Sequence, residues 1–453
     1  MLDLSAWDDG FDALSRHLPW DCLVAPGVVL LEEDAALLAV LEYRGRDQAV
    51  LDSGEQQRMA AGVAAVLQPF TGGWCLHFEL QRRWASAYPA GTGVHPASGL
   101  IDAERRDRLG GPGAGLVSRT FLAITWTPAL APVRRTAAWF TKGAPERQAA
   151  DVHRDHVQPF ARLVDQVGDL LARVLGFARV LTGPDLLGML HSCVSPVPIE
   201  RVAVPDVPGF PLKAALVDTG FLPGSFPCWT NGVARWPLRL VGVLGYPGAA
   251  HPGLMNGLLG LPFPFRWSLR FECMDQQQAK GVFAALWRRH DDTAYDWRSV
   301  LLRSVGGAQT LRHDAVGMLE ALEAEAARLD AAGAGMSAGW LTPTAVVWGG
   351  SVAEAEDRKD ALVKLLRGLG FACVEEGLGA ERAWVTAPCP ATSGPTRAQG
   401  ESAADDPGGA VGPGRALQPL AGGGLEPALA VPAAGPAGGR GRRGVPSGHR
   451  QRR

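Results

Sequence analysis

Lysine is scarce in this chain, and the five lysines that are present stand outside any nucleotide-binding motif. They are Lys142, Lys213, Lys280, Lys359 and Lys364, and none of them falls in the pattern G-x-x-x-x-G-K-[ST]. A P-loop needs that lysine against the β- and γ-phosphates, beside a glycine-rich backbone that cradles them. The sequence therefore lacks a Walker A motif, and we expect no ATP or magnesium site and no other cofactor in this chain.

The chain also lacks a long apolar run, a basic start and a strong net charge. Glu32, Glu33 and Asp34 interrupt the longest apolar candidate, residues 23–41, well short of the roughly 20 residues that span a bilayer. The first residues are acidic where a secretory signal is basic. A net charge of −2 gives no overall attraction to polyanions. We therefore expect no transmembrane segment, no direct nucleic-acid binding and a cytoplasmic location.

Recognisable catalytic and metal-binding patterns are absent as well. The seven cysteines are scattered from Cys22 to Cys389 without a C-x-x-C pair, which argues against a zinc ribbon or a disulfide framework and favours small buried side chains. The chain contains no H-E-x-x-H and no G-x-S-x-G, and no G-x-G-x-x-G opens a helix after a strand. The sequence thus assigns no catalytic, cofactor-binding or metal-ligating residue.

Two histidine-containing clusters admit a chemical interpretation beside a structural one. His153 and His156 could share a helix face as metal ligands, but an acidic first helical turn capped by Asp151 accounts for the same residues. His191 could activate Cys193 as a thiolate, but no third group is evident, and burial at the end of an apolar helix is the preferred interpretation.

Arginine pairs and tryptophans are the remaining candidates for surface function. The arginine pairs could line a basic groove, but in a nearly neutral chain we interpret them as solvated rims. Trp74, Trp126, Trp236, Trp267 and Trp348 lie within or beside expected strands, whereas Trp20 and Trp229 stand in proline-rich loops and could anchor a partner. The arginine pairs are Arg82-Arg83, Arg105-Arg106, Arg134-Arg135 and Arg288-Arg289.

Hydrophobic periodicity predicts an α+β fold in which strands and helices alternate twice. In the first alternation we expect strands at 28–31, 37–43, 74–80 and 120–127, with helices at 56–70 and 150–193. In the second we expect strands at 238–244, 266–273, 345–348 and 371–374, with helices at 254–259, 276–330 and 354–369. This order fits ferredoxin-like split βαβ units with helical insertions.

Three regions are expected along the chain. Residues 1–195 form an α+β unit with a helical block, and residues 196–390 form a proline-rich connection followed by a second α+β unit. Residues 391–453 contain 15 Gly and 8 Pro but no aromatic residue. Such a composition buries too little apolar surface to offset chain entropy, so we expect a disordered tail.

Several segments, read in order over about residues 10–385, resemble the N-terminal domain of the TrbE/CagE/VirB family of type IV secretion (conjugal transfer) ATPases. The resemblance rests on the ordered set, because no single segment is specific. The segments are Leu18-Pro-Trp-Asp-Cys, Gly73-Trp-Cys-Leu-His-Phe-Glu-Leu, Ser118-Arg-Thr-Phe-Leu, Leu190-His-Ser-Cys, Val204-Pro-Asp-Val-Pro and Pro262-Phe-Pro-Phe-Arg-Trp.

The resemblance implies an assembly or docking domain, peripheral to the bacterial inner membrane, that contacts inner-membrane subunits of the secretion apparatus and self-associates. In that family a P-loop ATPase domain follows, and we expect no catalysis without it. The likeness stops near Trp384, where text rich in Gly, Pro, Ala and Arg begins. We hypothesise a frameshifted or truncated ATPase, which a P-loop in another reading frame downstream would support. The alternatives are a nucleic-acid-binding accessory protein of conjugation and a non-functional product.

Overall fold

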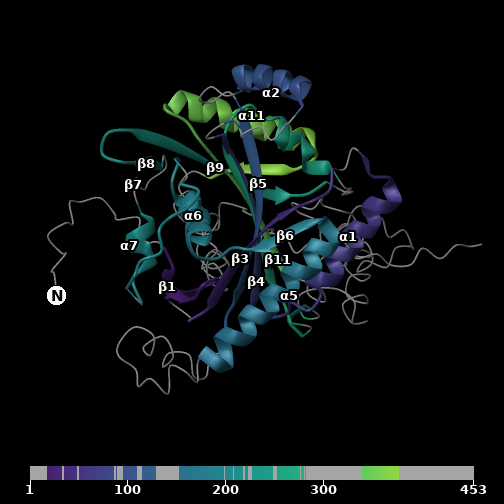
Figure 1. Cartoon of the computed structure of the whole chain (residues 1–453), viewed down its shortest axis with the longest axis vertical. Helices are drawn as coiled ribbons and strands as arrows, with labels where there is room; N and C mark the ends of the chain where they lie inside the picture. Colours follow the sequence, from purple (N-terminus) through teal and green to yellow (C-terminus); the bar gives the residue numbers. More distant parts are fainter. Residues whose placement is uncertain are drawn as a thin grey trace, which may run out of the picture.

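The chain folds around one antiparallel sheet with helices on both faces (Figure 1), which confirms the predicted α+β class. The predicted helices at 276–330 lie almost wholly, and the predicted tail at 391–453 wholly, outside the residues that the structure describes. The computed structural model describes residues 18–32, 35–47, 50–85, 88, 95–109, 115–128, 153–197, 199–207, 209–217, 220–222, 227–247, 253–275, 277–279, 281 and 339–376.

The first half of the sheet has the split βαβ order that the sequence predicts. Four strands pair in the order β6-β3-β5-β4, and all three pairs are antiparallel. This is the strand order of a ferredoxin-like unit, in which each helix connects two strands that are not adjacent in the sheet. The elements are β3 (Leu37–Arg44), α1 (Ser53–Leu67), β4 (Trp74–Trp84), β5 (Leu116–Trp126), α5 (Gln158–Leu175) and β6 (Phe177–Val180).

The second half repeats this arrangement. Its strands pair in the order β12-β9-β11-β10, again all antiparallel. The elements are β9 (Arg235–Gly245), the 3-10 helix η5 (Leu254–Gly260), β10 (Phe265–Cys273), β11 (Gly339–Trp348), α11 (Val352–Gly368) and β12 (Ala372–Glu375).

A short hairpin precedes each half and pairs with the first strand of that half. The hairpin of β1 (Trp20–Ala25) and β2 (Val28–Leu31) joins β3, and the hairpin of β7 (Gly220–Leu222) and β8 (Cys228–Thr230) joins β9. The same succession of hairpin, strands and helices therefore occurs twice. The described portion of the chain is a structural duplication.

The two halves meet edge to edge along β4 and β10. Residues 75–82 of β4 pair with residues 265–272 of β10 without a break in register. Among the described residues, the strands of both halves therefore belong to one 12-stranded sheet, and we call the β4–β10 junction the seam. The division of the chain at residue 195 stays a prediction.

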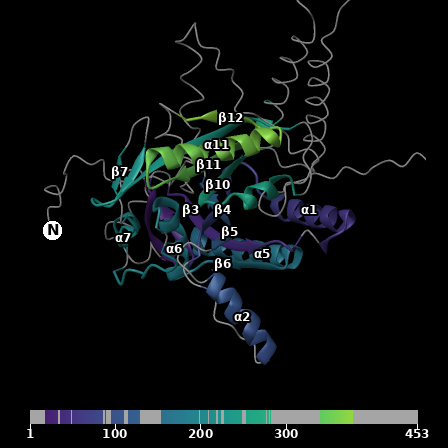
Figure 2. The same ribbon diagram turned by 90° about the horizontal axis from the view of Figure 1, so that it is seen from above.

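Side chains alternate between the two faces of the sheet, and each face is covered by its own helices. Helices α1, α5, η5 and α11 pack over the face that carries Leu41, Phe78 and Trp267. The opposite face carries Val40, Phe121 and Trp348 and is covered by α6 (Gly183–Val194) and α7 (Leu212–Leu216). Helix α2 (Pro96–Leu109), inserted between β4 and β5, points away from the rest (Figure 2).

Helix ends follow local sequence signals. The Asp52 side chain accepts a hydrogen bond from the Glu55 amide, and the Glu55 side chain accepts one from the Asp52 amide, so a capping box starts α1. Gly176 ends α5 in a left-handed conformation (φ 99°), which glycine adopts without steric cost. Within the described portion of the chain, no helix combines the length and apolar composition that crossing a bilayer requires.

Several local predictions were wrong. Trp20 and Trp229 do not stand in exposed loops: both lie in strands and are fully buried. Strand β6 lies within the predicted helical block at 150–193, and α7, β7 and β8 lie within the predicted proline-rich connection that begins at residue 196. Each of these elements is short or polar, so hydrophobic periodicity carries little signal for it.

Candidate functional site

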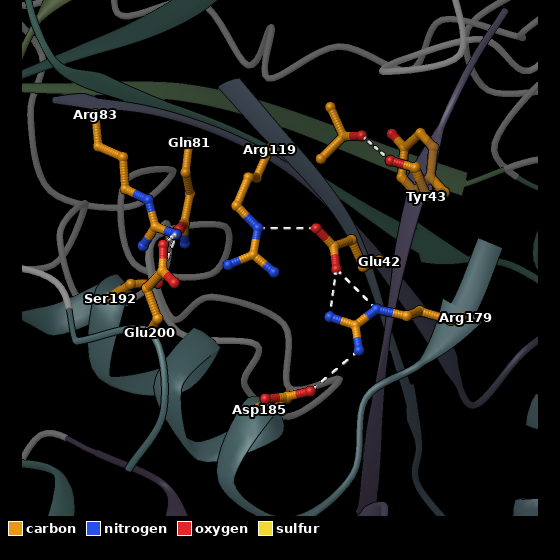
Figure 3. A network of polar contacts seen from close by, with 10 residues as sticks. Glu42, Tyr43, Gln81, Arg83, Arg119, Arg179, Asp185, Ser192 and Glu200 are labelled. Atoms are coloured by element: carbon orange, nitrogen blue, oxygen red, sulfur yellow. Dashed lines mark hydrogen bonds and ion pairs between the residues drawn. The ribbon is translucent and has the colours of Figure 1, made fainter. Parts of the chain in front are cut away.

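A charged network lies on the sheet face beneath helix α6, where β3 and β4 end and β5 begins. Strand alternation places Glu42 of β3, Gln81 and Arg83 of β4 and Arg119 of β5 on this one face. Figure 3 shows their side chains pointing toward α6 and toward one another. These polar positions interrupt strands that are otherwise apolar, which marks them as a candidate site.

Glu42 is the centre of the network. Its two carboxylate oxygens accept hydrogen bonds from two arginines, Arg119 Nε at 2.8 Å and Arg179 Nη2 at 2.8 Å. Arg179, on β6, also donates to Asp185 in the first turn of α6 at 3.0 Å (Figure 3). Charge-assisted bonds of this length are about twice as strong as neutral ones. The network therefore ties three strands and α6 together.

The pKa of Glu42 makes this tie dependent on pH. Burial alone raises the pKa, but hydrogen bonds from Arg119 and Arg179 and their positive charge outweigh it, so the pKa lies below its ordinary value of 4.5. A carboxyl with a lower pKa in the folded chain stabilises the fold above its unfolded pKa. That contribution is lost as the pH falls through the folded pKa.

We therefore expect Glu42→Gln to lower the free energy of unfolding at pH 7 by about 1.5–3 kcal/mol, the range for hydrogen bonds to charged groups. Below pH 4.5 the wild-type chain should lose this contribution, so the two chains should converge there. Urea unfolding at a series of pH values measures the difference. Glu104→Gln, which removes an exposed pair on α2, is the matched control. A Glu42→Gln deficit that persists unchanged at low pH would contradict the assignment.

An extended segment, residues 195–197 and 199–207, runs back along the outside of α6, and we call it the covering segment. The Ile199 amide donates to His191 Nδ1 at 3.2 Å, and the Val202 amide donates to the Pro184 carbonyl at 3.1 Å. The segment crosses the helix at Gly188, where an added Cβ would lie 2.0 Å from the Glu200 carbonyl oxygen. Only glycine leaves room for this crossing.

The covering segment also reaches the charged network. Arg201 pairs with Asp185 at 3.1 Å, and Glu200 pairs with Arg83 at 3.4 Å (Figure 3). Beneath them the Ser192 hydroxyl donates to Gln81 Oε1 at 2.7 Å. The sheet, α6 and the covering segment thus form three layers that polar contacts hold together.

A second polar group lies on the same face at the seam. Arg266 of β10 contacts Glu79 of β4 through Nε at 2.5 Å, and its Nη1 donates to the carbonyl of Cys193 at the end of α6. His77 and Ser268 form a further hydrogen bond of 2.6 Å across the same two strands. All of these side chains are buried. Polar contacts therefore hold both halves of the chain to α6.

The structure shows what surrounds His156, His191 and Cys193, which belong to the two histidine-containing clusters that the sequence singled out. The His156 ring lies 5.9 Å from the Trp126 ring, while Asp151 and the His153 side chain lie outside the described residues. No group of three His, Cys, Asp or Glu side chains suited to a metal ion occurs in the described ranges. His191 and Cys193 lie on α6, and burial raises the pKa of Cys193 to about 12. A thiol held protonated in this way is a poor nucleophile.

The two arginine pairs that the structure describes make separate contacts. Arg82 donates to the Leu261 carbonyl at 3.1 Å, and Arg83 joins the charged network. Arg106 pairs with Asp102 of its own helix. The other two pairs, Arg134-Arg135 and Arg288-Arg289, lie outside the described residues.

Comparison with known proteins addresses the predicted family directly. Residues 27–133 match the family model "Type IV secretion system ATPase VirB4/TrbE, N-terminal domain". This range holds β3, α1, β4 and β5, and with them six residues of the two polar groups. These are Glu42, His77, Glu79, Gln81, Arg83 and Arg119.

Two relatives match beyond this range. The chain is 24% identical over 402 residues to the conjugal transfer protein TrbE of Rhizobium radiobacter, covering 85% of the chain and 47% of that protein. It is 24% identical over 148 residues to a probable conjugal transfer protein TrbE of Sinorhizobium fredii, covering 33% of the chain and 22% of that protein. The chain thus spans less than half the length of either relative. The predicted resemblance is confirmed: residues 27–133 are similar to the N-terminal domain of the VirB4/TrbE type IV secretion system ATPases.

Proposed function

We propose that this chain is an assembly and docking unit of a type IV secretion or conjugal DNA-transfer ATPase and does not itself hydrolyse ATP. The observation that carries the proposal is the match of residues 27–133 to the N-terminal domain of that family. That domain is built here into a duplicated sheet, in a chain whose five lysines all lie outside a P-loop. The polar groups described above hold structural layers together, which suits a rigid binding platform.

We propose inner-membrane subunits of the secretion apparatus as the partners, together with further copies of this chain. This places the chain at the cytoplasmic face of the bacterial inner membrane as a peripheral protein. The family implies such partners, and the chain offers exposed apolar side chains for them, including Leu100 and Ile101 on α2 at 75% and 53% exposure.

Co-purification tests the proposal. The full chain, carrying an affinity tag, is co-expressed with inner-membrane subunits of a type IV secretion apparatus, and the membranes are solubilised in detergent. We expect the subunits to elute with the chain and to stay with it through gel filtration. An unrelated inner-membrane protein expressed at the same level serves as the control and should not elute.

An ATPase assay on the same purified chain tests the non-catalytic assignment. We expect no magnesium-dependent release of phosphate. Turnover that co-elutes with the chain during gel filtration would overturn that assignment. Failure of every subunit to co-purify would overturn the docking assignment.

A further inference from the structure

Arg83 is a largely covered cation whose charge is incompletely balanced. Its side chain is only 11% exposed, yet its contact with Glu200 is 3.4 Å long, whereas charge-assisted hydrogen bonds are usually about 2.7–2.9 Å. Glu200 itself is 64% exposed. Within the described residues this is the one hydrogen bond that the Arg83 guanidinium makes, although it carries five N–H donors. Burial and the nearby charge of Arg119 lower the pKa of Arg83.

The whole network is short of negative charge. Four guanidinium groups face three carboxylates, and the two strongest acceptors are already shared among the other arginines. Glu42 binds Arg119 and Arg179, while Asp185 binds Arg179 and Arg201. Only Glu200, on the covering segment, is left for Arg83 among the described residues of this network. A further carboxylate at this point would therefore gain charge-assisted bonds without displacing a strong one.

Exposed aliphatic side chains stand on the strand and the segment beside the Arg83–Glu200 contact. Val117 lies opposite Arg83 on β5 and is 43% exposed. Val197 and Ile199, which precede Glu200 in the covering segment, are 58% and 45% exposed. A recessed cation within an exposed apolar rim is an arrangement typical of protein interfaces, whose centres combine arginine with apolar contacts.

We propose that this surface, formed by Arg83, Val117, Val197 and Ile199, binds a partner segment in which an aspartate or glutamate stands beside aliphatic side chains. The partner carboxylate takes the place of Glu200 on Arg83, and the aliphatic groups cover the rim. Glu200 thus acts as an internal competitor that holds the site until a partner arrives. The inference rests on the proposed docking function and names the chemistry of the partner.

A nucleic-acid phosphate would also suit an arginine, but the surroundings disfavour it. The network lacks one negative charge, whereas a nucleic-acid backbone brings one at every nucleotide, and the apolar rim would leave the other phosphates without a counter-charge. The carboxylate and aliphatic combination satisfies both features of the surface. Binding of single-stranded DNA is therefore an outcome that counts against the proposal.

The test uses the full chain and fluorescent 12-residue peptides that tile the cytoplasmic segments of the inner-membrane subunits used for co-purification. Fluorescence anisotropy measures the binding of each peptide and of a dT12 oligonucleotide. We expect at least one peptide with an acidic residue among aliphatic residues to bind. Arg83→Gln should weaken it by about tenfold or more, as expected when one partner of a recessed charge pair is removed.

The Glu200→Gln variant gives the sharper result, because it should act in the opposite direction. Removing the internal competitor should tighten binding roughly threefold to tenfold. Damage to the fold would weaken binding in both variants, so opposite effects separate a binding role from a structural one. Arg162→Gln, on the exposed side of α5, is the matched control and should leave binding unchanged.

Three results would overturn the inference. They are absence of binding by every peptide, equal binding by the Arg83→Gln chain, and weaker binding by the Glu200→Gln chain. The test of this surface can fail without contradicting the proposed docking function. Intact subunits that co-purify equally with wild type and Arg83→Gln would uphold docking and reject this surface.

Discussion

Replacing Arg266 with methionine is expected to lower the free energy of unfolding by about 3–5 kcal/mol, the usual cost of breaking a buried ion pair from one side. Arg266 is 2% exposed, and its guanidinium binds both the Glu79 carboxylate and the Cys193 carbonyl. Without it Glu79, which is 3% exposed, faces no compensating charge. Burial already raises the pKa of Glu79, so some of the cost will be met by protonation of that carboxyl.

Urea unfolding followed by far-UV circular dichroism measures this loss. The double variant Glu79→Leu/Arg266→Met removes both charges and should recover much of it, because a buried pair can be replaced by apolar groups of similar volume at little net cost. Arg108→Met breaks an exposed pair on α2 and should cost less than about 1 kcal/mol. A double variant no more stable than the single one would show that the ion pair is not the cause.

Gly188→Ala is expected to push the covering segment away from α6. The new Cβ would lie 2.0 Å from the Glu200 carbonyl oxygen and 2.9 Å from the Arg201 amide nitrogen, and backbone atoms cannot yield as a side chain can. Overpacking of this kind typically costs about 1–3 kcal/mol. Displacement should also separate Glu200 from Arg83.

Limited digestion with trypsin reports the displacement at Arg201, because cleavage there requires the segment to leave the helix. Each 1.4 kcal/mol of lost local stability corresponds to about a tenfold rise in cleavage rate when opening is fast. Gly99→Ala in the exposed helix α2 is the matched control, since its Cβ would meet nothing within 4 Å. That change should stabilise α2 by roughly 0.5–1 kcal/mol. Unchanged cleavage in the Gly188→Ala chain would contradict the packing argument.

The ferredoxin-like halves could be predicted from the sequence because their strands and helices carry strong periodic signals. Trp74 to Leu80 alternates as a strand should, and the apolar stripe of α5 repeats at helical spacing. The pairing of β4 with β10 could not be predicted in this way. It joins residues almost 200 positions apart, and no local pattern specifies which edges meet.

Apart from Arg83, the residues of the charged network and of the polar group at the seam were missed because each looks ordinary alone. Glu79, Gln81 and Arg83 occupy alternate positions of a strand, which is equally the pattern of a solvated sheet face. Only the structure shows α6 covering that face, so that the same residues become buried. A polar residue at every second position in an otherwise apolar strand was the available signal. That pattern cannot tell whether the polar face of the strand is in contact with water or covered by a helix.

The seam has a consequence for how the chain reaches its fold. If either half folded alone, β4 or β10 would present a long unpaired strand edge, and Glu79 or Arg266 would lack its counter-charge. Unpaired edges of this kind template association with other chains. The N-terminal half is synthesised first, so the edge of β4 stays unpaired and prone to association until β10 of the C-terminal half pairs with it. In the complete fold, each half of the duplication therefore covers the open strand edge of the other half.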